Sequence, residues 1–66
     1  MIVTVNGDTI EAVDGATVPM LLDQLGVRPR SVVVELNGNA LMPSELPGVV
    51  LQNGDVLELV RAVAGG

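Results

Sequence analysis

Only one segment of this chain has the periodicity of an α-helix, and that segment limits the folds available to the chain. Its apolar side chains recur at positions i, i+3, i+4 and i+7, on one face of a helix: Val18, Leu21, Leu22 and Leu25. Thr17 is suited to cap the start of the helix, Pro19 fits its first turn, and Gly26 is suited to end it in a left-handed conformation. A chain of 66 residues with one such helix has to bury this apolar face against strands.

Short β-branched segments separated by turn residues make up most of the remaining chain. The segments with this pattern are residues 1–6, 9–13, 31–36, 49–51 and 56–62. The first two flank Asn6-Gly7-Asp8 and predict a hairpin. Residues 43–48 contain two prolines and predict a loop with one helical turn capped by Ser44.

This order of elements predicts an α+β fold of two layers, in which one main helix packs on a small mixed sheet. The first and last strands are expected to lie side by side in the middle of that sheet. We predict a single domain over residues 1–62, followed by a flexible C-terminal tail over residues 63–66 that ends in Gly-Gly.

The residue types that the chain lacks exclude most kinds of function. It has no His, Cys, Lys, Trp, Tyr or Phe, so it has no imidazole base, no thiolate nucleophile and no ordinary zinc ligand set. A self-contained enzyme is therefore not expected. Eight carboxylates against three arginines give a formal charge of −5, which also argues against nucleic acid as a partner.

The sequence contains no sign of a membrane span or a secretion signal. No apolar run approaches the roughly 20 residues that a membrane helix needs. Residues 1–5 lack the basic region and the cleavage pattern of a signal peptide. We therefore expect a soluble cytoplasmic protein with no membrane partner.

The charged side chains indicate which face of each strand points to water, because alternate side chains of a strand point to opposite faces. With Thr4, Glu35 and Glu58 turned outward, four apolar side chains share their face: Ile2, Val33, Val56 and Val60. The side chains expected in the core with the helix are Val3, Val5, Val32, Val34, Leu36, Leu57 and Leu59. An exposed apolar patch with Glu35 and Glu58 at its rim indicates a protein-binding surface. The alternative is that a valine-rich chain leaves some valines outside.

The chain ends in Gly65-Gly66 directly after the last predicted strand. Glycine has no Cβ, so such an end can pass through a narrow channel into the active site of another protein. There the Gly66 carboxylate can attack the α-phosphate of ATP, and a sulfur donor can displace AMP to leave a thiocarboxylate. The alternative is a frayed terminus, because final residues are commonly small and mobile.

Each arginine has two interpretations. Arg61 can orient the tail in a partner's channel, or it can pair with an acidic neighbour at the end of the strand. Arg28 and Arg30 can contact ATP or a partner carboxylate, but nothing nearby in the sequence shapes a phosphate site. A solvated linker is therefore the favoured interpretation for these two.

Several short motifs occur together in the order and spacing of a known family. They are Val5-Asn6-Gly7-Asp8, Ala16-Thr17-Val18, Leu21-Leu22, Leu25-Gly26, Val34-Glu35-Leu36-Asn37-Gly38, Pro43-Ser44-Glu45, Asn53-Gly54-Asp55 and Gly65-Gly66. On these motifs, which span essentially the whole chain, the sequence resembles the ThiS sulfur carriers of thiamine biosynthesis, within the wider ThiS/MoaD family. The resemblance implies a ubiquitin-like β-grasp fold, and the predicted order of elements fits that fold.

The resemblance also implies a role as a carrier and a set of partners. A ThiF-like adenylyltransferase, related to ubiquitin-activating enzymes, would adenylate Gly66 with ATP and magnesium. Gly65, which has no side chain, would let Gly66 reach the active site of that enzyme. A persulfide derived from a cysteine desulfurase would then supply sulfur, and thiazole synthase would accept it from the thiocarboxylate. The carrier itself is expected to bind no cofactor.

Two positions depart from the family pattern. Leu46 follows the Ser-Glu pair, and Val60 lies in the last strand, where family members often carry aromatic residues. Both replacements are apolar, so they put the identity of the partner in question more than the fold. Two alternatives stay open: a carrier for molybdopterin or another pathway, and a non-covalent β-grasp interaction module whose Gly-Gly end is incidental.

Overall fold

In the computed structural model, which describes residues 1–62, five strands form one mixed sheet in the order β2-β1-β5-β3-β4. The strands are β1 (Ile2–Val5), β2 (Asp8–Glu11), β3 (Val32–Leu36), β4 (Asn39–Leu41) and β5 (Val56–Arg61). β1 and β5 are parallel neighbours, and the other pairs are antiparallel. The first and last strands thus lie side by side inside the sheet. This is the ubiquitin-like β-grasp arrangement predicted from the order of elements.

The helix α1 (Val18–Gln24) begins and ends with the local chemistry that the sequence predicts. The Thr17 hydroxyl accepts a hydrogen bond from the Met20 amide at 3.4 Å. At the other end Gly26 adopts φ +70°, and the Val27 amide donates to the Leu22 carbonyl at 2.8 Å, which closes the helix in a Schellman motif.

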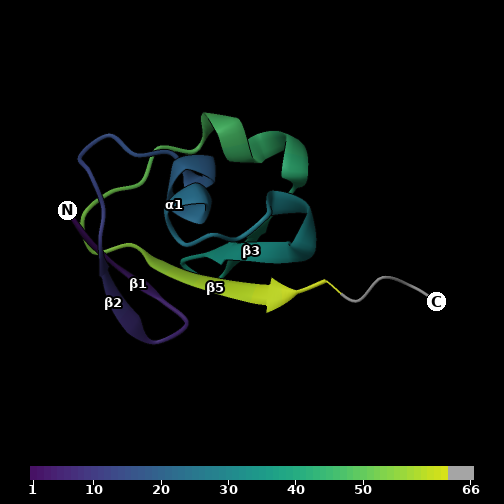
Figure 1. Cartoon of the computed structure of the whole chain (residues 1–66), viewed down its shortest axis with the longest axis horizontal. Coiled ribbons are helices and arrows are strands. Elements are labelled where there is room, and N and C mark those ends of the chain that lie inside the picture. The colour runs from purple at the N-terminus through teal and green to yellow at the C-terminus, as the bar shows by residue number, and fades with distance from the viewer. Residues whose placement is uncertain (63–66) are drawn as a thin grey trace.

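The core lies between α1 and one face of the sheet (Figure 1). The buried apolar side chains are Val3, Val5, Ala12, Ala16, Val18, Leu21, Leu22, Val34, Leu46, Leu51 and Leu57. The remaining predicted core residues, Leu25, Val32, Leu36 and Leu59, are partly buried against them. In Figure 1 the two short 3-10 helices, η1 (Pro29–Ser31) and η2 (Pro43–Gly48), join α1 on this side, and the opposite face is open over the described residues.

Three local predictions were wrong. Residues 49–51 do not form a sheet strand; a single bridge joins Val50 to Thr17, beside the start of α1. The strand β4 was not predicted, although it follows Asn37-Gly38 in a two-residue hairpin turn. The helical turn at η2 exists, but Ser44 does not cap it; the Glu45 carboxylate accepts a hydrogen bond from the Met42 amide instead.

The two hairpin asparagines hold β5 in place with their side chains. Asn6 has φ +49° in the β1–β2 turn, and its amide oxygen accepts from the Leu59 amide at 2.7 Å while its Nδ2 donates to the Leu59 carbonyl at 3.3 Å. On the other side of β5, the Asn37 Oδ1 accepts from the Val56 amide at 2.9 Å. Asn6 therefore continues the pairing along β5 beyond the point where the ladder between β1 and β5 ends, at Val5 and Leu57.

We expect Asn6→Ala to lower the free energy of unfolding by about 2 kcal/mol, because it removes both hydrogen bonds to Leu59 and because alanine tolerates positive φ less well than asparagine does. Asn6→Gly tolerates that φ, so it isolates the lost hydrogen bonds and should cost about 1 kcal/mol. Urea unfolding measures both values. Asn39→Ala, an exposed asparagine in β4, is the control and should be nearly neutral. Wild-type stability for Asn6→Gly would show that the side-chain bonds to β5 contribute nothing.

Candidate functional site

The open face of the sheet carries the four apolar side chains that the alternation predicts. Ile2, Val33, Val56 and Val60 are between 44% and 51% exposed. Val33 lies directly opposite Val60 in the β3–β5 ladder, at the end of the sheet where the chain leaves β5. Toward the other end of the sheet, Val56 of β5 pairs with Thr4 of β1. Ile2 lies in β1, on the same face as Thr4.

The two carboxylates of this face lie inside the apolar surface rather than at its rim. Glu35 is the direct partner of Glu58 in the β3–β5 ladder, one position along the same face from the Val33–Val60 pair. The prediction that these residues border the patch was therefore wrong, because the register between β3 and β5 places them between its two apolar ends. Like charges directly opposite each other on a sheet are destabilising, so this pair lowers the stability of the isolated domain.

Arg61 does not belong to the open face. It pairs with Val32 and has the same phase along β5 as Leu57 and Leu59, so it lies toward the helix side at the end of the sheet. Within residues 1–62 the one ion pair joins the Met1 amino group to Asp14 at 3.1 Å, so Arg61 has no acidic partner in this part of the chain. Of the two interpretations of Arg61, the pairing with a neighbouring acid is not seen there.

The root of the tail is fixed to the sheet by its last main-chain bond. β5 ends at Arg61, and the Ala62 amide donates to the Ser31 carbonyl at 2.8 Å. Gly65 and Gly66 lie outside the described residues, as does the whole predicted tail over residues 63–66. The predicted domain boundary at residue 62 and the predicted role of the two glycines therefore stay predictions.

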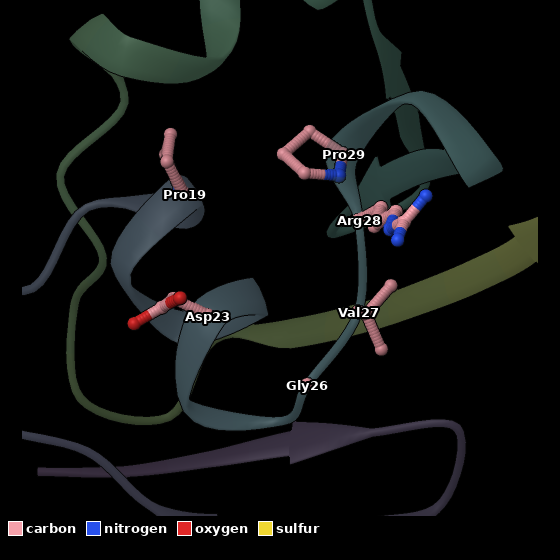
Figure 2. A pocket seen from close by; sticks show the side chains of 6 residues that line it. All are labelled: Pro19, Asp23, Gly26, Val27, Arg28 and Pro29. Carbon is pink, nitrogen blue, oxygen red and sulfur yellow. The ribbon is translucent and has the colours of Figure 1, made fainter.

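A pocket of about 350 Å³ lies between α1 and the segment that leads to η1 (Figure 2). Pro19 and Pro29 lie on opposite sides of it, and the carboxylate of Asp23 and the guanidinium of Arg28 point apart. A hydrolytic or transfer site would need a nucleophile with an adjacent base. Asp23 is the one carboxylate among the lining residues, and no second group of that kind lies beside it in the pocket.

The described part of the chain contains neither a metal-ligand cluster nor a membrane helix. No group of three or more His, Cys, Asp or Glu residues is arranged to hold a metal ion within residues 1–62. Over the same residues, no helix is long and apolar enough to cross a membrane. The cytoplasmic location stays a prediction.

Comparison with known proteins agrees with the resemblance seen in the motifs. The model of the ThiS family matches residues 3–66. A protein named sulfur carrier protein ThiS from Thermus thermophilus is 36% identical over 64 residues, which cover 97% of this chain and 98% of that protein. Proteins named thiazole synthase from Paramagnetospirillum magneticum and Magnetococcus marinus are each 36% identical over all 66 residues, but the match covers only 20% of their own length.

Solved structures agree with the fold. The crystal structure of the thiamine biosynthesis protein ThiS from Geobacter metallireducens superposes with a TM-score of 0.80 at 37% identity and covers both chains completely. A solution structure of a thiamine biosynthesis protein from the same organism gives a TM-score of 0.78 at 33% identity, covering all of this chain and 88% of the other. On the family match, the sequence relatives and the shared fold, this chain belongs to the ThiS family.

Proposed function

We propose that this chain is a sulfur carrier protein for thiazole formation in thiamine biosynthesis. The observation that carries the proposal is the family match, which runs to Gly66 and so includes the terminal pair of glycines. The relative from Thermus thermophilus, named a sulfur carrier protein, matches along nearly its whole length and supports the same role. On this proposal the reacting group is the Gly66 carboxylate, and the folded body is the part that partners recognise.

The chemistry at Gly66 begins with its activation. The carboxylate attacks the α-phosphate of ATP, which forms an acyl adenylate and releases pyrophosphate. A persulfide derived from a cysteine desulfurase then attacks the acyl carbon and AMP leaves. A thiol reduces the resulting acyl disulfide, which leaves the terminal thiocarboxylate and a new disulfide. Because this chain has no His, Cys or Lys, we assign the phosphate-binding and acid–base groups, with ATP and magnesium, to a ThiF-like adenylyltransferase.

Thiazole synthase is the acceptor that the relatives favour. In two proteins of that name, a segment similar to this entire chain makes up about one fifth of the polypeptide. A carrier-like segment within the same polypeptide supports delivery to thiazole synthase over delivery to molybdopterin synthesis. Because Gly65 has no side chain, it lets the end of the chain enter a narrow channel in the acceptor.

The open sheet face is the surface that we assign to partner recognition. Val33 and Val60 offer apolar area next to the root of the tail, and Ile2 and Val56 extend it along the sheet. Between the apolar ends, the opposed carboxylates of Glu35 and Glu58 are suited to receive a basic side chain of a partner. Such a contact would relieve their mutual repulsion only in the complex. The same face also supports the second candidate function, a non-covalent interaction module.

Removal of Gly66 tests the carrier function against the non-covalent module. We expect the intact chain, incubated with the adenylyltransferase, ATP and a sulfur source, to gain the mass that corresponds to replacement of one oxygen by sulfur. A chain without Gly66, or with residues added after it, should show no such gain and should still bind the adenylyltransferase. Intact-mass spectrometry measures the conversion. Sulfur incorporation into the lengthened chain would contradict the assignment of Gly66.

Charge placed on the open face should block recognition. We expect Val33→Asp and Val60→Asp each to weaken binding to the adenylyltransferase at least about tenfold, because a carboxylate replaces apolar contact area beside the root of the tail. Titration calorimetry measures the affinity, and circular dichroism checks the fold. Val13→Asp, at a side chain that is 64% exposed outside the sheet, is the matched control. Equal weakening by the control would remove the assignment of this face.

Removal of one charge from the Glu35–Glu58 pair should stabilise the domain and weaken its binding to the adenylyltransferase. We expect Glu35→Gln to raise the free energy of unfolding by about 0.5 kcal/mol at low salt, since it removes the like charge opposite Glu58. The same variant should bind the adenylyltransferase less tightly. Glu11→Gln, an equal charge change opposite Ile2 on the open face, is the control and should leave stability nearly unchanged. If the two variants shift the urea midpoint equally, the Glu35–Glu58 pair is not repulsive.

A further inference from the structure

All three arginines of this acidic chain surround the root of the tail, although Arg28 and Arg30 are far from Arg61 in the sequence. Arg28 and Arg61 line one depression of about 470 Å³, together with Ala62. Arg30 lines a neighbouring depression of about 640 Å³ whose wall also includes Ala62. No carboxylate lines either depression, whereas the chain as a whole carries eight acidic residues.

Short hydrogen bonds hold the arginines and the tail root together. The Ala62 amide donates to the Ser31 carbonyl at 2.8 Å. The Ser31 amide and hydroxyl both donate to the Arg28 carbonyl, at 2.9 and 2.7 Å. The turn that carries Arg28 and Arg30 is thus bonded through one serine to the residue from which the tail departs. The main chain of the turn that carries Arg28 and Arg30 therefore keeps a fixed position beside the start of the tail.

The charge of these groups is not neutralised within the described residues. None of the three arginines forms an ion pair or a side-chain hydrogen bond inside residues 1–62. Asp23 shares a pocket with Arg28, but Figure 2 shows its carboxylate pointing away from the guanidinium. In a chain of formal charge −5, this leaves one positive end where the tail begins.

The length of the tail decides which anion these groups can meet. Four residues span at most about 14 Å, and only when fully extended. If Gly66 is to enter a narrow channel and reach ATP, its chain has to be extended, and the arginines at the root then stay at the mouth of the channel. At that place they meet the protein surface of the partner and lie away from the α-phosphate. Arginine binds carboxylates with two parallel hydrogen bonds, so acidic side chains suit this position.

We propose that Arg28, Arg30 and Arg61 form a docking surface for an acidic segment at the channel mouth of the adenylylating partner. The proposal rests on the carrier function proposed above and deepens it. The positive end of the chain meets the acidic rim, which directs the tail toward the opening and keeps the acidic remainder of the body away from that rim. Electrostatic attraction of this kind mainly accelerates association and fixes orientation.

The kinetic test uses the double variant Arg28→Gln/Arg61→Gln in pyrophosphate exchange catalysed by the adenylyltransferase. We expect the KM for the carrier to rise about tenfold and to lose most of its dependence on salt, while kcat stays within about twofold. The control Val13→Glu/Gln52→Glu has the same net charge, changed at exposed positions away from the arginines. An unchanged KM, or an equal rise in the control, would overturn the docking surface.

The same experiment separates this proposal from the carrier function. If the double variant behaves as wild type while deletion of Gly66 abolishes exchange, the docking surface is wrong and the carrier function stands. If neither the wild type nor the variant supports exchange, the carrier function fails. A loss of kcat at unchanged KM would mean that the arginines act on the reacting phosphate, which also overturns docking to an acidic rim.

A direct probe identifies the class of anion. The isotope-labelled chain is titrated with hexaglutamate and, separately, with ATP at matched ionic strength, and amide shifts are followed by NMR. We expect hexaglutamate to move the amides of residues 27–32 and 61–62, and the double variant to lose this response. A larger response to ATP at the same amides would assign the surface to phosphate, and no response to hexaglutamate would leave no acidic docking site. Either result contradicts the proposal.

Discussion

The whole arrangement depends on the last strand being held inside the sheet. β5 pairs in parallel with β1 on one side and antiparallel with β3 on the other. The side chains of Asn6 and Asn37 add hydrogen bonds to β5 beyond those of the main-chain ladders. Because the chain end follows directly from this strand, the tail root has a defined position relative to the open face and the arginine turn. A chain end that followed an edge strand would lack this two-sided support.

The parts of the structure that depend on local chemistry could be predicted from the sequence. The periodicity of Leu21 and Leu22, the cap at Thr17 and the left-handed Gly26 are properties of one short segment, and the structure has all of them. The exposure of Val33 and Val60 also followed from local alternation, because the charged residues of the same strands set the phase. The interpretation of the terminal glycines as a functional chain end depended on their place in a family pattern.

The parts that depend on pairing between distant segments could not be predicted in this way. The opposition of Glu35 and Glu58 is a property of the register between β3 and β5, which alternation alone does not fix. The approach of Arg28 to Arg61 follows from the pairing of β3 with β5, which places Val32 opposite Arg61 and lets the Ala62 amide donate to the Ser31 carbonyl. The strand β4 is different, because Asn37-Gly38 is a hairpin signal that could have located it despite its three residues.

The folded body and the chain end have separate tasks in the proposed mechanism: the body binds, and the terminal carboxylate reacts. The most direct measurement compares exchange of radiolabelled pyrophosphate into ATP, catalysed by the adenylyltransferase, for the natural chain and for a semisynthetic chain ending in a Gly66 carboxamide. The natural chain should support exchange, whereas the carboxamide should support none and should still bind with similar affinity as a competitive inhibitor. Exchange with the carboxamide at the natural rate would contradict the assignment of the reaction to the chain end.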